Sequence, residues 1–110
     1  MNIPTLACSF ALACGLAFTP FGGAFAETLA SVTIDNFTFK PATLSVKVGT
    51  TVTFTNADDI PHSVVASDGS FRSRALDTGD KYAFTFKNPG DFGYFCGLHP
   101  HMQGHIVVTP

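Results

Sequence analysis

The stretch GDFGYFCGLHPHMQG, residues 90–104, joins the alternating pattern of a β-strand to a close group of sulfur and imidazole side chains. In its first half Phe92, Tyr94 and Cys96 occupy alternate positions, so their side chains are expected on one face of a strand. If that face is the interior of a β-sandwich, the cysteine sulfur enters its site from a rigid, packed strand. The residues that follow Cys96 are then expected to form a loop.

Cys96, His99 and Met102 have the spacing of metal ligands, with two residues between successive donors. A thiolate, an imidazole and a thioether together favour copper, because Zn²⁺ rarely binds methionine and because Mg²⁺ and Ca²⁺ prefer oxygen. The missing ligand is expected to be a second imidazole, which the upstream Pro61-His62 dipeptide supplies. We therefore predict one copper ion per chain, in a trigonal plane with a weak axial thioether. Its ligands in this interpretation are His62, Cys96 and His99 in the plane and Met102 on the axis.

Eight short segments are rich in Val, Thr, Ile and Phe, and turn-forming residues separate several of them. Strands with one apolar face need a second sheet to cover that face, so we predict an all-β fold, a Greek-key β-sandwich of about seven to eight strands. The expected strands are residues 32–34, 37–39, 44–48, 51–55, 63–65, 82–86, 91–96 and 105–109. We expect six phenylalanines to fill the core: Phe37, Phe39, Phe54, Phe84, Phe86 and Phe92.

The first 26 residues contain no charged side chain, and the first acidic residue is Glu27. This segment ends in AFA, residues 24–26, a small-x-small pattern that signal peptidase recognises. We therefore predict a signal peptide over residues 1–26, cleaved after Ala26, and a single exported domain over residues 27–110. The alternatives are a retained membrane anchor and lipidation at Cys14.

Cleavage would remove Cys8 and Cys14 and leave Cys96 as the only cysteine of the mature chain. A lone cysteine cannot form an internal disulfide, whereas a bound metal would account for its presence in an exported domain of about 84 residues. The formal net charge is −2 and the basic residues are scattered along the chain. Nucleic acid is therefore not an expected partner.

These residues resemble the cupredoxins, the family of type 1 blue copper proteins, and within it the amicyanins, with the pseudoazurins and plastocyanins as neighbours. The resemblance extends over the mature chain, from FTFKP at 37–41 through VTFTN at 52–56 and Pro61-His62 to C-x-x-H-x-x-M at 96–102. It implies a Greek-key sandwich, one type 1 copper, and the transfer of single electrons in the periplasm.

Three positions depart from the family's pattern. Ser63 follows the first histidine where close relatives carry Asn, so the hydrogen bond between this segment and the cysteine loop is expected to be made differently. Leu98 stands where relatives place Pro before the second histidine, which restores a backbone N–H near the sulfur. His101 replaces an aromatic residue, and we expect this additional imidazole to face solvent beside the site.

The sequence therefore predicts a monomeric periplasmic electron carrier, free of the membrane after signal cleavage. It would dock on a redox partner protein through an apolar rim around His99, with Leu98 and Pro100 as contact residues. The alternative is a periplasmic protein that buffers or delivers copper with the same ligands. An enzyme is less well supported, because multicopper oxidases and copper nitrite reductases need further copper sites and several domains.

Overall fold

The computed structural model describes residues 28–110, so the signal peptide predicted over residues 1–26 lies outside the described residues. The described chain contains eight strands. They are β2 (Leu29–Asp35), β3 (Thr38–Lys40), β4 (Thr43–Lys47), β5 (Thr50–Asn56), β6 (Val65–Ala66), β7 (Lys81–Phe86), β8 (Gly90–Phe95) and β9 (Gln103–Thr109). Over residues 28–110 there is no helix, and hence none long and apolar enough to cross a membrane.

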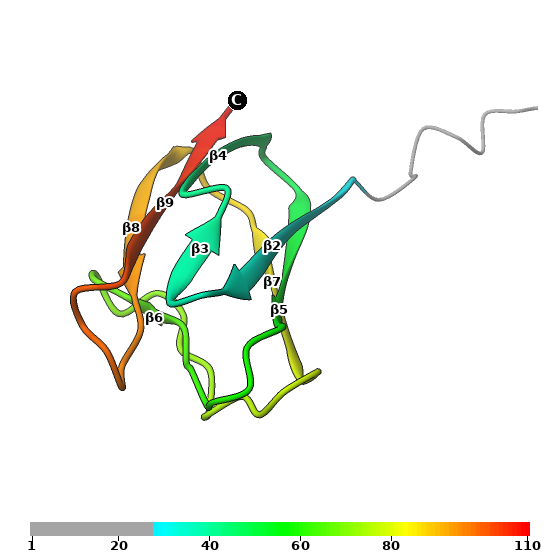
Figure 1. Ribbon diagram of the computed structural model, residues 1–110. Coiled ribbons are helices and arrows are strands. Elements are labelled where there is room, and N and C mark those ends of the chain that lie inside the picture. The colour runs from blue at the N-terminus through cyan, green and yellow to red at the C-terminus, as the bar shows by residue number, and fades with distance from the viewer. Residues whose placement is uncertain (1–27) are drawn as a thin grey trace, which may run out of the picture.

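The strands form two four-stranded sheets that face one another as a sandwich (Figure 1). One sheet has the order β3-β2-β5-β7 and the other the order β4-β9-β8-β6, so the chain passes repeatedly from one sheet to the other. Two neighbouring pairs, β2 with β5 and β4 with β9, are parallel, and the remaining pairs are antiparallel. The predicted all-β sandwich is confirmed.

The strand that leads to the cysteine is fixed by the packing of Tyr94. This residue is 1% exposed, and its ring meets Phe39 and Phe54 edge-on at centroid distances of 4.7 and 5.3 Å. Tyr94 lies opposite Gly104 on β9, where a Cβ atom would be 2.5 Å from the tyrosine ring. The ring therefore covers a position that only glycine fits. Cys96, two residues after Tyr94, lies on the same buried face.

The phenol of Tyr94 is buried without a hydrogen bond to any atom of the described residues. Burial raises its pKa above the ordinary value, because the charged form would lose its hydration. An unmade hydrogen bond of this kind is a cost that the surrounding aromatic packing offsets.

We predict that Tyr94→Phe leaves the free energy of unfolding unchanged or raises it by up to about 1 kcal/mol, because it removes only the unpaired hydroxyl. Urea unfolding of the metal-free protein measures the change. A loss of more than about 1 kcal/mol would show that the hydroxyl makes a stabilising hydrogen bond in solution.

Two sequence-based expectations need correction. Phe37 was expected in the core on a strand, but it is 44% exposed and lies in the two-residue turn between β2 and β3. Asn36 and Phe37 have φ angles of 51° and 58°, the positive values that a tight two-residue hairpin turn requires, so strand alternation does not apply to them. The strand expected at residues 63–65 begins only at Val65, as β6, so Ser63 and Val64 lie before it.

The other five phenylalanines expected in the core do contribute to it. Phe39, Phe54 and Phe86 are buried, and Phe84 and Phe92 are partly buried against the core cluster. The connections that follow β5 and β8 both lie at the end of the sandwich away from the C-terminus (Figure 1). These two connections carry the predicted metal ligands.

Candidate metal centre

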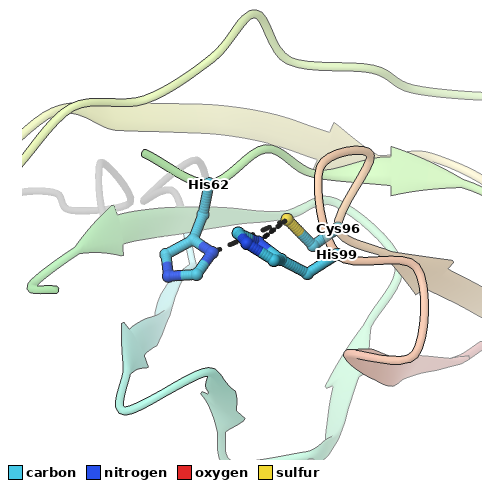
Figure 2. Close-up of side chains that lie close together, drawn as sticks. All are labelled: His62, Cys96 and His99. Atoms are coloured by element: carbon cyan, nitrogen blue, oxygen red, sulfur yellow. Dashed lines mark hydrogen bonds between the residues drawn. The ribbon is translucent and has the colours of Figure 1, made fainter. Parts of the chain in front are cut away.

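Three of the predicted ligands converge at this end of the sandwich (Figure 2). The donor atoms of His62, Cys96 and His99 all lie within 4.8 Å of one another. The Cys96 Sγ atom is 3.6 Å from His62 Nδ1 and 3.7 Å from His99 Nδ1. His62 and Cys96 are fully buried, whereas His99 is half-buried. The two connections thus bring residues from distant parts of the sequence to one point.

The backbone of His62 is fixed on the connection after β5 by a pair of hydrogen bonds to Leu76. The His62 N–H donates to the Leu76 carbonyl at 3.1 Å, and the Leu76 N–H donates to the His62 carbonyl at 2.6 Å. Leu76 is itself fully buried. The first histidine is therefore attached to the core although it lies outside the named strands.

Cys96 comes directly after β8, and the loop it begins closes on itself through its backbone. The Cys96 N–H donates to the Met102 carbonyl at 3.1 Å, while the His99 and Met102 N–H groups donate to the Cys96 and His99 carbonyls. These bonds return the chain to Cys96 just before β9 begins. Met102, 3% exposed, belongs to the same buried cluster as Cys96.

The spacing of the donors fits a bound metal. Bond lengths known for zinc in proteins, about 2.3 Å to sulfur and about 2.05 Å to nitrogen, place the two donors about 3.6 Å apart at a tetrahedral angle and about 3.8 Å apart at a trigonal one. The observed sulfur–nitrogen distances of 3.6 and 3.7 Å lie within this range. One thiolate and two imidazoles, with a thioether on the same loop, are a donor set that favours copper.

Asp58 was not recognised from the sequence, yet it orients the first histidine. Its Oδ2 atom is 2.7 Å from His62 Nε2, on the side of the ring away from the sulfur. The same carboxylate accepts the N–H groups of Asn36 and Phe37 at 2.7 and 3.0 Å. A carboxylate that accepts the Nε2 proton leaves Nδ1 free to bind a metal. The only sequence signal was an acidic residue four positions before His62.

The hydrogen bond from the Phe37 N–H, with further bonds from His62 and Asn36, lowers the pKa of Asp58 from 3.8 to about 2. A carboxyl group whose pKa is lower in the folded state stabilises the protein at every pH above the pKa it has in the unfolded chain. This contribution is lost as the pH falls through the pKa it has in the folded protein. Asp58 therefore contributes fully above pH 3.8, and its contribution disappears as the pH falls to about 2.

We predict that Asp58→Asn lowers the melting temperature of the metal-free protein near neutral pH, and that its difference from wild type shrinks between pH 3.8 and about 2. Thermal unfolding followed by circular dichroism at a series of pH values checks this. Asp59→Asn, at the exposed neighbouring carboxylate, is the matched control. A difference between Asp58→Asn and wild type that stays constant over this range would contradict an electrostatic role.

Ser63 makes the connection to the cysteine loop that the sequence left open. Its N–H points at the Cys96 sulfur at 3.4 Å, and its hydroxyl accepts the Gly97 N–H at 2.9 Å. A Cβ atom on residue 97 would lie 2.8 Å from that hydroxyl, so glycine leaves the space that the serine oxygen occupies. Serine and glycine thus form a matched pair across the two connections.

The remaining residues of the loop face outward. Leu98 is 51% exposed, and Pro100 and His101 are also exposed. The cluster of donor atoms found among residues 28–110 includes His62, Cys96 and His99 but not His101. The additional imidazole therefore lies on the surface of the loop, as expected.

The fold and the donor set together define a cupredoxin. The chain belongs to this family, since residues 6–108 match the cupredoxin-like domain. Amicyanin from Paracoccus denitrificans is 32% identical over 96 residues, which are 82% of this chain and 73% of that protein. Amicyanin from Paracoccus versutus is 30% identical over 82 residues, which are 70% of this chain and 62% of that protein. Plastocyanin from Tetradesmus obliquus is 31% identical over 115 residues, which are 89% of this chain and 79% of that protein.

Solved structures agree with this assignment. A purple cupredoxin from Nitrosopumilus maritimus has a TM-score of 0.69 at 33% identity, covering 73% of this chain and 99% of its own. A reduced amicyanin mutant has a TM-score of 0.69 at 31% identity, covering 82% of this chain and 91% of its own. The resemblance to cupredoxins and amicyanins is confirmed, and copper is the cofactor that both the family and the donor set indicate.

Proposed function

We propose that residues 27–110 form a mature periplasmic domain, released after Ala26, that carries one electron at a time on a mononuclear type 1 copper centre. The proposed ligands are His62, Cys96, His99 and Met102. The observation that most supports this proposal is the convergence of a buried sulfur and two imidazoles, 3.6 and 3.7 Å from it, at one end of a rigid sandwich.

The rigidity of the donors suits electron transfer. Copper, when bound, supplies a one-electron couple between Cu(II) and Cu(I). A site that moves little between the two states lowers the reorganisation cost of each transfer. Cys96 is held at the end of a packed strand, and His62 is held by Leu76 through its backbone and by Asp58 through its ring.

The half-buried ring of His99 is the proposed route for electrons. Its neighbours in the sequence, Leu98 and Pro100, are both exposed. Exposed apolar residues beside this histidine fit brief docking of a redox partner protein by an otherwise monomeric carrier. A catalytic role is not proposed, since the chain corresponds to 25% of the copper nitrite reductase from Thermus scotoductus, another protein of similar fold.

The ligand assignment predicts opposite outcomes for the two sulfur residues. Cys96→Ser should fold but lose the intense visible colour of the copper-loaded protein, because that colour arises from the thiolate. Met102→Leu should keep copper and raise the reduction potential, because a weak axial ligand tunes the site more than it holds the ion. Visible spectra, voltammetry and copper analysis measure both, with His101→Ala as a control that keeps its colour. Retained colour in Cys96→Ser would refute the assignment.

An electron carrier and a copper-delivery protein differ in what leaves the site. We predict reversible voltammetry of the loaded protein, with copper retained when the reduced form is mixed with the Cu(I) chelator bathocuproine disulfonate. Transfer of Cu(I) to the chelator faster than electron exchange would instead favour copper buffering or delivery.

A further inference from the structure

Phe37 is an unusual residue for the place it occupies. It lies at the tip of the β2–β3 hairpin with a φ of 58° and is 44% exposed. A bulky residue at positive φ is strained, and asparagine or glycine is the usual choice in such turns. Neither backbone preference nor core packing accounts for a phenylalanine here.

The ring of Phe37 does have specific neighbours, which are the two imidazoles of the metal centre. Its centroid lies 5.5 Å from that of His62 and 5.2 Å from that of His99, and both contacts are perpendicular at 88°. The two histidine rings are themselves 5.2 Å apart. The three rings therefore form a nearly equilateral triangle, in the range of favourable edge-to-face contacts.

The position of Phe37 is set independently of the loop from Cys96 to Met102, here called the copper loop. The carboxylate of Asp58 accepts the N–H groups of both turn residues, Asn36 and Phe37, and also bonds to His62. The hairpin tip and the first histidine are therefore held by one group. The second histidine, His99, lies on the loop and is half-buried, so Phe37 gives its ring a fixed surface to rest on.

Phe37 also lines a groove of about 320 Å³. His101 and Met102 line it from the copper loop, together with Thr38, Phe39, Ala42 and Gln103. One water molecule needs roughly 10–15 Å³ of such space, so small anions fit in the groove. Phe37 thus borders the groove, and its ring contacts the imidazoles.

We infer that Phe37 is a positioning residue of the metal centre, with two effects. Its ring holds the imidazole of His99 in its inward orientation, and it separates the metal position from the groove so that small ligands do not reach it. This inference rests on the metal site of the proposed function but not on the identity of a redox partner.

The test compares Phe37→Ala with a matched control, Val48→Ala. Val48 is 40% exposed, and its N–H bonds to Thr109 near the C-terminus, away from the copper loop. Azide is titrated into the Cu(II)-loaded proteins while the visible and electron paramagnetic resonance spectra are followed. Phe37→Ala should bind azide at least about tenfold more tightly than wild type, whereas Val48→Ala should not. Phe37→Tyr, which keeps the ring, should behave as wild type.

A second measurement uses the metal-free proteins. Nuclear magnetic resonance should show weaker cross-relaxation between the ring protons of His62 and His99 in Phe37→Ala, because the His99 ring is free to turn away, while Phe37→Tyr keeps the wild-type intensity. Azide affinity in Phe37→Ala within about twofold of Val48→Ala would overturn the barrier, and unchanged His62–His99 cross-relaxation would overturn the positioning role. A wild-type protein without copper colour would refute the proposed function, yet the metal-free comparison would still decide the role of Phe37.

Discussion

The burial of the Cys96 sulfur at the end of a packed strand is the constraint on which the rest of the site depends. A thiolate is costly to bury unless donors or a cation surround it. Here the sulfur is fully buried, receives the Ser63 N–H at 3.4 Å, and faces two imidazoles. Every element near it contributes to this arrangement: the aromatic packing of Tyr94 fixes the strand, and the backbone bonds of the loop return Met102 to the cysteine.

Much of this arrangement was predictable because its determinants are local or periodic. Strand alternation placed Tyr94 and Cys96 on one face, which is buried, and donor spacing singled out Cys96 and His99, whose donor atoms converge with those of His62. The error at Phe37 has a local cause as well. Phe37 and Phe39 alternate around Thr38 like residues of one strand, and nothing in the residue type of phenylalanine indicates a positive φ. β6 begins later than expected because Val64 bonds to Ser73, through its N–H to the hydroxyl and through its carbonyl to the N–H.

Asp58 shows why the remainder was not predictable. Its partners are separated from it by four residues in one direction and by 21 and 22 in the other. Whether an acidic side chain before a histidine reaches that ring depends on where the hairpin tip lies, and the sequence does not state this. Ser63 was also only partly predictable. The sequence shows that serine stands where close relatives carry asparagine, but the space for its hydroxyl at Gly97 is seen only in the folded chain.

The double attachment of the Asp58 carboxylate also constrains how this surface can vary. Exposed turns ordinarily accept insertions and deletions, because few interactions depend on their length. The β2–β3 tip has only two residues, and the N–H groups of both are committed to the group that orients His62. One added residue would misalign these donors and disturb a histidine elsewhere in the chain. This short exposed hairpin is therefore as fixed in length as a strand in the interior.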